Sequence, residues 1–234
     1  MPSTLFDSPF SCFVTGTDTE IGKTLIASTI IHLQTNKGYR VAGMKPVAAG
    51  TLFREHPPEQ RSQWFNEDVE SLAGASNLVV AQELMCPYLF KLPVAPHIAA
   101  RLENVQINPS TILKAFEQIK QLSQAVVVEG VGGFRVPLTQ SFDTADLAVK
   151  LKLPVILVVA MRLGCINHAL LTAEAIRSRG LELVGWVANS AEEPMNKLEE
   201  NIEAIDARIK APRLAHVPFL IDVSVQTALR YFDI

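Results

Sequence analysis

The chain has 234 residues, 48% of them hydrophobic, and a formal net charge of −3 at pH 7. This length and apolar content predict one folded domain with a large core over residues 1–234, exclude disorder as the main state, and give no indication of nucleic-acid binding. Three scattered cysteines, a start without basic residues and no apolar run longer than Leu153–Met161 predict a cytoplasmic protein without a membrane span.

The first elements form a phosphate-binding pattern. An apolar strand over Cys12–Val14 ends at Thr15-Gly16, and a polar loop leads to Gly22-Lys23-Thr24 and a helix over Leu25–Gln34. Strand, glycine-bounded loop, lysine, hydroxyl and helix in this order predict a P-loop, in which Lys23 reaches the terminal phosphates and Thr24 binds Mg²⁺. Five residues separate Gly16 from Gly22 instead of the usual four, so the loop must be one residue longer. The alternative is a chance Gly-Lys-Thr at an ordinary helix start.

The rest of the chain alternates apolar strands with helices. Strands are predicted at Tyr39–Met44, Ala125–Val128, Pro154–Val159, Leu183–Ala188 and Leu214–Val217. Helices are predicted at Asn66–Gly74, from near His97, and at Ser110–Leu122, Thr144–Leu151, Asn167–Arg179 and Glu193–Ile209. Gly50–Gln63 is predicted to be a surface loop, and Pro87–Pro96, with three prolines, to be irregular. Strands this apolar indicate an α/β fold with a parallel sheet covered by helices on both faces.

Polar residues gather where the predicted strands end, which is where parallel sheets bind ligands. Lys45 follows the second strand, Glu129 ends the third, and Asn189 ends a later one. Glu129 and Asp68 are candidate Mg²⁺ ligands, and Lys45 is a candidate second cation for a transferring phosphoryl group. Four alternatives stay open: a solvated strand-end acid at Glu129, a helix N-terminal acid at Asp68, an ordinary surface lysine at Lys45 and a turn-forming Asn189.

Seven motifs in order resemble the dethiobiotin synthetase family. They are Val14–Thr24, Ala42–Ala48, the Asn66 and Asp68 pair, Val128–Gly133, Leu153–Val159, Gly164–His168 and Gly185–Asn189, with a weaker match near Val217-Pro218. The family's pattern includes the long-spaced P-loop. The resemblance implies a Rossmann-like, three-layer P-loop NTPase fold in a single domain.

The resemblance also implies a reaction. The substrates would be 7,8-diaminononanoate, CO2 and MgATP, and the products dethiobiotin, ADP and phosphate, formed through a carbamate and a carbamic-phosphoric anhydride. The enzyme would be a ligase of biotin biosynthesis. It would work as a homodimer with the site at the interface, without nucleic acid or membrane as a partner.

By matching position, the resemblance assigns roles to individual residues. Lys23 and Lys45 would be catalytic, and Thr24, Asp68 and Glu129 would hold Mg²⁺. The nucleotide would contact Thr19, Glu20, Ile21, Gly22, Lys23, Thr24, Leu25, Asp68, Glu129, Gly130, Val131, Gly132, Asn189, Ser190, Pro218, Phe219 and Leu220. The substrate would contact Ala49 and, from the partner subunit, Gly164, Cys165, Ile166 and Asn167.

Three departures from the family pattern concern substrate binding. Ala49 stands where the family usually has serine, Phe134 stands where Trp is frequent, and the loop Thr51–Gln63 is long. Two other classes were weighed. An ATP-switch protein of the partition or cell-division class would need a membrane-targeting tail or a basic surface, whereas the tail over Ser224–Ile234 is short and ordinary in charge. An amidoligase acting on a cobalamin precursor commonly carries a glutaminase domain, for which the chain has no room.

Overall fold

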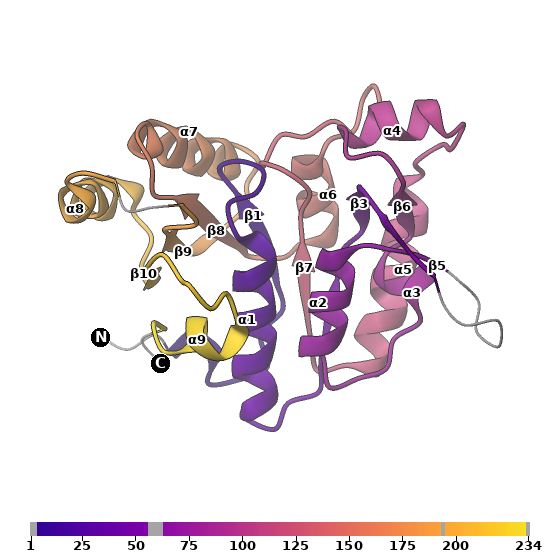
Figure 1. The fold of residues 1–234 in the computed structure, drawn as a ribbon, viewed down its shortest axis with the longest axis horizontal. Helices are drawn as coiled ribbons and strands as arrows, with labels where there is room; N and C mark the ends of the chain where they lie inside the picture. The colour runs from indigo at the N-terminus through magenta and orange to yellow at the C-terminus, as the bar shows by residue number, and fades with distance from the viewer. Residues whose placement is uncertain (1–3, 56–62, 193–194, 233–234) are drawn as a thin grey trace.

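The structure, a computed structural model, describes residues 4–55, 63–192 and 195–232. Its centre is a six-stranded sheet in the order β10-β9-β8-β1-β7-β2, in which all neighbouring strands are parallel (Figure 1). The strands are β1 (Cys12–Gly16), β2 (Val41–Met44), β7 (Ala125–Glu129), β8 (Val155–Ala160), β9 (Leu183–Asn189) and β10 (Arg213–Val217). This arrangement confirms the predicted α/β fold with a parallel sheet.

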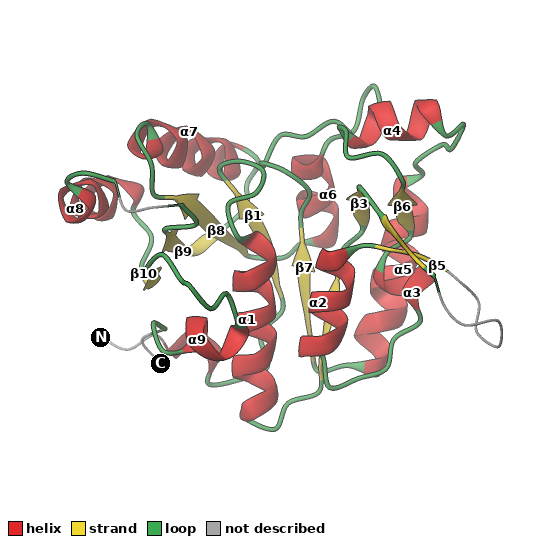
Figure 2. Cartoon of the chain, viewed as in Figure 1, coloured by secondary structure: helices red, strands yellow, loops and turns green. Residues whose placement is uncertain are grey.

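Helices cover both faces of this sheet (Figure 2). One face packs against α1 (Lys23–Asn36), α2 (Glu67–Ala75) and α9 (Val225–Leu229). The other packs against α4 (Pro96–Leu102), α5 (Pro109–Leu122), α6 (Thr144–Leu151), α7 (Cys165–Ser178) and α8 (Leu198–Ile209). Alternate residues of β1 supply the two cores: Cys12 and Val14 face α1, while Phe13 faces the opposite layer. The continuous apolar strands are therefore buried on both sides.

Small elements flank the carboxyl end of β2. The strand β3 (Val47–Ala49) pairs in parallel with β6 (Tyr88–Phe90), and β4 (Leu52–Arg54) pairs in antiparallel with β5 (Gln63–Phe65). Two shorter helices, η1 (Thr4–Phe6) and α3 (Gln82–Met85), complete the described elements. No helix in the described ranges is both long and apolar enough to cross a membrane.

The structure corrects several predicted boundaries. The segment Pro87–Pro96 is not wholly irregular, because Tyr88–Phe90 forms β6, and the predicted surface loop Gly50–Gln63 contains β4 and the start of β5. Residues 56–62 of that loop lie outside the described ones. The helix predicted from Glu193 begins at Leu198, after a non-helical stretch at 195–197, and residues 193–194 are again outside the described ranges. The helix predicted from Asn167 begins earlier, at Cys165.

Candidate active site

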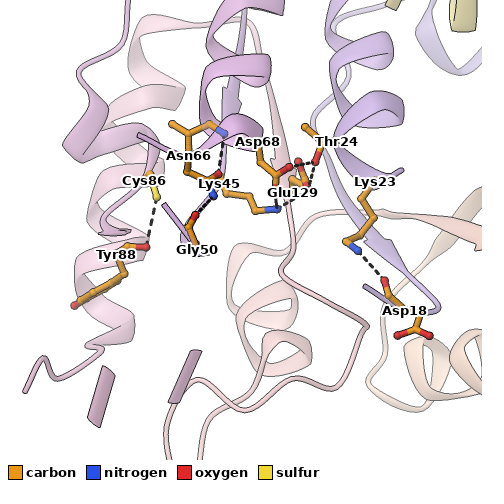
Figure 3. Close-up of polar contacts among 11 residues, drawn as sticks. Asp18, Lys23, Thr24, Lys45, Gly50, Asn66, Asp68, Cys86, Tyr88 and Glu129 are labelled. Carbon is orange, nitrogen blue, oxygen red and sulfur yellow. Dashed lines mark hydrogen bonds and ion pairs between the residues drawn. The ribbon is translucent and has the colours of Figure 1, made fainter. Parts of the chain in front are cut away.

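The loop between β1 and α1 has the backbone of an anion-binding turn. Glu20 and Gly22 both have positive φ, 57° and 83°, on either side of Ile21. Left-handed residues in a turn direct successive N–H groups into one concavity, and the N-terminus of α1 adds its positive end there. Lys23 is buried, and its Nζ donates to the backbone oxygen of Asp18 at 2.7 Å (Figure 3). The loop therefore offers N–H groups and an ammonium to one anionic ligand.

Beside this loop, four side chains from four parts of the chain meet (Figure 3). The Thr24 hydroxyl donates to Asp68 Oδ1 at 2.6 Å and lies 2.9 Å from Glu129 Oε1. The Lys45 ammonium lies 2.8 Å from Asp68 Oδ2 and 2.5 Å from Glu129 Oε1. The structure thus brings together the phosphate loop, the end of β2, the start of α2 and the end of β7.

Local structure fixes each of these groups. Glu129 is the last residue of β7, next to β1, and is 1% exposed. Lys45 follows β2, where its N–H donates to Met85 O at 2.9 Å. Asn66 caps α2 by accepting from the Val69 N–H and holds Gly50 O at 2.7 Å, which places Asp68 in the first helical turn. Asp68 is thus a helix N-terminal acid that also reaches the cluster.

Burial and mutual attraction set the charges of this cluster. Burial alone would lower the pKa of Lys45, but Glu129 and Asp68 together raise it above its ordinary value. Burial raises the pKa of Glu129, with Lys45 opposing, whereas Lys45 and Thr24 outweigh burial and lower the pKa of Asp68. For Lys23, burial and the neighbouring charge of Lys45 lower the pKa to about 8. A lysine that readily loses its charge therefore lies beside one that keeps it.

A cavity of about 600 Å³ opens onto the loop and the cluster. Its lining includes most of the predicted nucleotide residues together with Ala49, namely Thr19, Glu20, Ile21, Gly22, Lys23, Thr24, Leu25, Asp68, Glu129, Val131 and Gly132. Gly130 does not line it; its N–H donates to Val14 O at 2.9 Å. Residues that sequence reasoning missed also line it: Ser28, Gly50, Asn66, Glu67, Ser71, Val223 and Val225. Helical spacing from Thr24 could have indicated Ser28, but no sequence signal places Val223 there.

A second pocket of about 110 Å³ shares Gly22, Leu25 and Val223 with the main cavity. Its other walls are Asn189, Ser190, Ala191, Pro218, Phe219 and Leu220, which include all the predicted nucleotide residues that the main cavity lacks except Gly130. Asn189 is 3% exposed, and its amide nitrogen donates to Ile21 O at 2.7 Å. A largely apolar pocket next to the phosphate loop suits the base of a nucleotide.

The predicted substrate residues of Gly164–Asn167 lie elsewhere. They form the N-terminal turn of α7, and they line neither pocket of the chain. Gly164 and Asn167 are exposed, and the preceding Leu163 is 92% exposed. Within one chain the structure therefore does not bring this turn to Ala49.

The residues of the cluster fit a magnesium ion held together with phosphate oxygens. Thr24, Asp68 and Glu129 are hard oxygen donors, the kind that Mg²⁺ prefers. The second carboxylate oxygen of Glu129 is buried and has no hydrogen-bond partner among the described residues, so an acceptor stays open there. The described part of the chain has no group of three or more His, Cys, Asp or Glu side chains that could hold a metal ion by themselves.

Known proteins similar to this chain include enzymes and a cell division protein complex. The family model described as an AAA domain matches residues 11–227. The chain is 49% identical over 224 residues to "ATP-dependent dethiobiotin synthetase BioD" of Janthinobacterium sp. (strain Marseille), covering 96% of this chain and 94% of that protein. It is 51% identical over 210 residues to the protein of the same name from Aromatoleum aromaticum, covering 90% and 91%. The solved "MinC:MinD cell division protein complex" of Aquifex aeolicus has a TM-score of 0.56 at 15% identity, covering 96% of this chain and 87% of that one, and shows the fold alone.

Proposed function

The chain belongs to the family of ATP-dependent dethiobiotin synthetases, and on this basis we propose how its residues carry out the reaction. As a member of that family it is an ATP-dependent ligase that forms dethiobiotin in biotin biosynthesis. The observation that carries the proposal for its site is the second lysine. Lys45 contacts Asp68 and Glu129, the same two carboxylates that Thr24 of the phosphate loop contacts.

The proposed chemistry has three bond-forming steps. One amine of 7,8-diaminononanoate attacks CO2 and loses a proton, which gives a carbamate. A carbamate oxygen then attacks the γ-phosphorus of ATP, and ADP leaves. The second amine attacks the carbonyl carbon of the resulting anhydride and loses a proton, phosphate leaves, and the ring closes to a cyclic urea. None of these steps needs a protein nucleophile, so positioning and charge neutralisation are the protein's task.

The chain's own residues supply that neutralisation. Lys23 turns from Asp18 O toward the terminal phosphates, and Lys45 offers its ammonium to the carbamate and the transferring phosphoryl group. The N–H groups of the loop bind the phosphate oxygens, while the Asn189 pocket takes the adenine. Thr24, Asp68 and Glu129 would hold Mg²⁺, which would supply positive charge to the phosphates when bound. Ala49 lines the cavity and has no hydroxyl to offer the diamine.

A second copy of the chain is proposed to complete the substrate site. The N-terminal turn of α7, with Gly164 and Asn167 exposed, lines neither the main cavity nor the second pocket of its own chain. In a homodimer this turn would reach the cavity of the partner, where its free N–H groups would bind the substrate. The enzyme would act in the cytoplasm.

One assay tests the reaction and the role of Lys45. Purified protein with MgATP, bicarbonate and diaminononanoate is expected to form dethiobiotin and to release ADP only when the diamine is present. The substitution Lys45→Ala removes the ammonium and is expected to lower kcat by about a hundredfold or more, because the transferring phosphoryl group loses a nearby positive charge. Product is measured by mass spectrometry and ADP by a coupled assay.

An exposed lysine of α5 provides the matched control. Lys120→Ala removes an ammonium near the end of α5, just before the start of β7, whereas Glu129 lies at the other end of that strand, and is expected to leave turnover unchanged. Near-ultraviolet circular dichroism shows whether Lys45→Ala keeps its tertiary structure. ADP release by the wild type that does not depend on the diamine would overturn the ligase proposal in favour of an ATP switch.

A further inference from the structure

One hydrogen bond joins the phosphate loop to the far side of the base pocket. Asn189 is the last residue of β9, and its amide nitrogen donates to the carbonyl of Ile21 at 2.7 Å. The two residues are 3% and 2% exposed, so water does not compete for this contact. The bond connects residues 168 positions apart in the chain.

Ile21 lies where the loop most needs support. The residues on either side of it, Glu20 and Gly22, both have positive φ, and Glu20 carries a side chain that disfavours this conformation. Such a backbone persists where surrounding contacts hold it. The Ile21 carbonyl is held by Asn189, and the Gly22 carbonyl accepts from Ile26 N at 3.1 Å inside α1. The contact with Asn189 is therefore a support for this turn that comes from outside the loop and its own helix. Thr17 and Asp18, at the start of the loop, are held separately, by Val158 O and by Arg162.

Gly22 and Asn189 also fill each other's space. A Cβ on Gly22 would lie 2.3 Å from Asn189 Nδ2 and 3.4 Å from its Cγ, so no other residue fits beneath the amide. A carbonyl oxygen can only accept, so the amide nitrogen must face Ile21 and the amide keeps one orientation. Asn189 thus contacts the loop and also lines the smaller pocket.

From these contacts we propose that Asn189 is a positioning residue for the phosphate loop. Its amide holds the Ile21 carbonyl and thereby keeps the N–H groups of the loop in the arrangement that receives phosphate. Phosphate binding then depends on Asn189 even when a ligand has no base. The proposal rests on the proposed function only in taking the loop as the site of the ATP phosphates.

Inorganic tripolyphosphate is the probe, because it has the phosphates of ATP and no base. Asn189→Leu keeps the branched shape of the side chain and removes the donor, while Asn189→Ala removes the donor with the smallest side chain. Loss of one buried hydrogen bond is expected to weaken tripolyphosphate binding about five- to tenfold in both variants, measured by titration calorimetry. If Asn189→Leu does not fold, Asn189→Ala gives the same comparison.

Asn77 provides a control away from the site. Its exposed amide donates to the Tyr39 carbonyl at 2.8 Å and accepts from the Val41 N–H at 2.9 Å, at the opposite end of β2 from the site. Asn77→Leu removes an amide contact that is remote from the loop. It is expected to lower the melting temperature and to leave tripolyphosphate binding unchanged. In the Asn189 variants, the KM for ATP is expected to rise and the KM for the diamine to stay, whereas general loss of structure would raise both.

Two outcomes would overturn the inference. In the first, Asn189→Leu and Asn189→Ala bind tripolyphosphate as tightly as the wild type but bind ADP more weakly. Asn189 would then contact the base only. Equal weakening in Asn77→Leu would make the effect a generic one. The proposed function fails separately: a wild type that binds tripolyphosphate as expected but forms no dethiobiotin would refute the reaction and leave the role of Asn189 standing.

Discussion

The depressed pKa of Lys23 makes nucleotide binding a proton-uptake reaction at alkaline pH. Burial and the charge of Lys45 lower the pKa of Lys23 to about 8 from 10.5. A bound phosphate supplies the negative charge that restores the ammonium, so the pKa rises again in the complex. Since the free protein has lost this proton above pH 8 and the complex holds it, binding must take up a proton and weaken as pH rises.

The size of the uptake follows from the two states. With a pKa of about 8 in the free protein, about nine tenths of Lys23 is neutral near pH 9 and about one tenth near pH 7. If the complex restores the ordinary lysine pKa, ADP binding takes up about 0.9 proton near pH 9 and about 0.1 near pH 7. Lys45 does not contribute, because its neighbours raise its pKa and it keeps its proton throughout this range.

Titration calorimetry measures this number directly. The binding heat of ADP is recorded near pH 9 in two buffers of different ionisation enthalpy, and the difference gives the protons taken up. Lys23→Arg is the control, because a guanidinium stays charged and should abolish the uptake. A binding heat that is the same in both buffers near pH 9 for the wild type would refute the reasoning.

Two further predictions concern the diamine and the core. Ala49→Ser is expected to lower the diamine KM about fivefold, because the serine hydroxyl adds one hydrogen bond from the cavity wall. Steady-state kinetics at saturating ATP measures this KM. An unchanged KM would mean that water or another group already makes the hydrogen bond. Gly43→Ala is expected to cost about 1–3 kcal/mol, because its Cβ would lie 2.8 Å from Leu72 Cβ and 2.9 Å from Ile31 Cδ1. Gly74→Ala, a helical position with nothing within 4 Å, should instead stabilise by about 0.5–1 kcal/mol; urea unfolding that gives both the same sign would contradict the packing argument.

The sequence predicted the central sheet because each of its strands is a continuous apolar run. Val155–Ala160 is buried at every position, and helices separate it from its neighbours, so neither its type nor its surroundings were ambiguous. The strand β6 was missed because it has three residues between prolines and exists only by pairing with β3, 41 residues earlier in the chain. Short strands of this kind depend on tertiary pairing and leave little periodicity to detect.

The candidate site also contains residues that the sequence could place and one that depends on tertiary contacts. Lys45 and Glu129 lie at strand ends, and Lys23 and Thr24 begin the helix that follows the first strand and its loop. The carboxyl edge of a parallel sheet brings such residues together. Asp68 comes from a helix after the long loop, and spacing alone favoured a simple N-terminal acid. Its contact with Lys45 depends on Asn66 holding Gly50, a fold-level contact that no local pattern contains.

The role proposed for Lys45 explains why a lysine would suit this position better than an arginine. In the structure its ammonium is the counter-charge for Asp68 and Glu129, without which burial would favour protonated Glu129. When phosphate oxygens and Mg²⁺ contribute charge to the same place, the ammonium no longer has to balance both carboxylates alone. A compact charge on a flexible four-carbon stem can then turn to the transferring group. A guanidinium would bind the two carboxylates through several fixed donors and remain on them, so arginine would serve the resting site and fail the reaction.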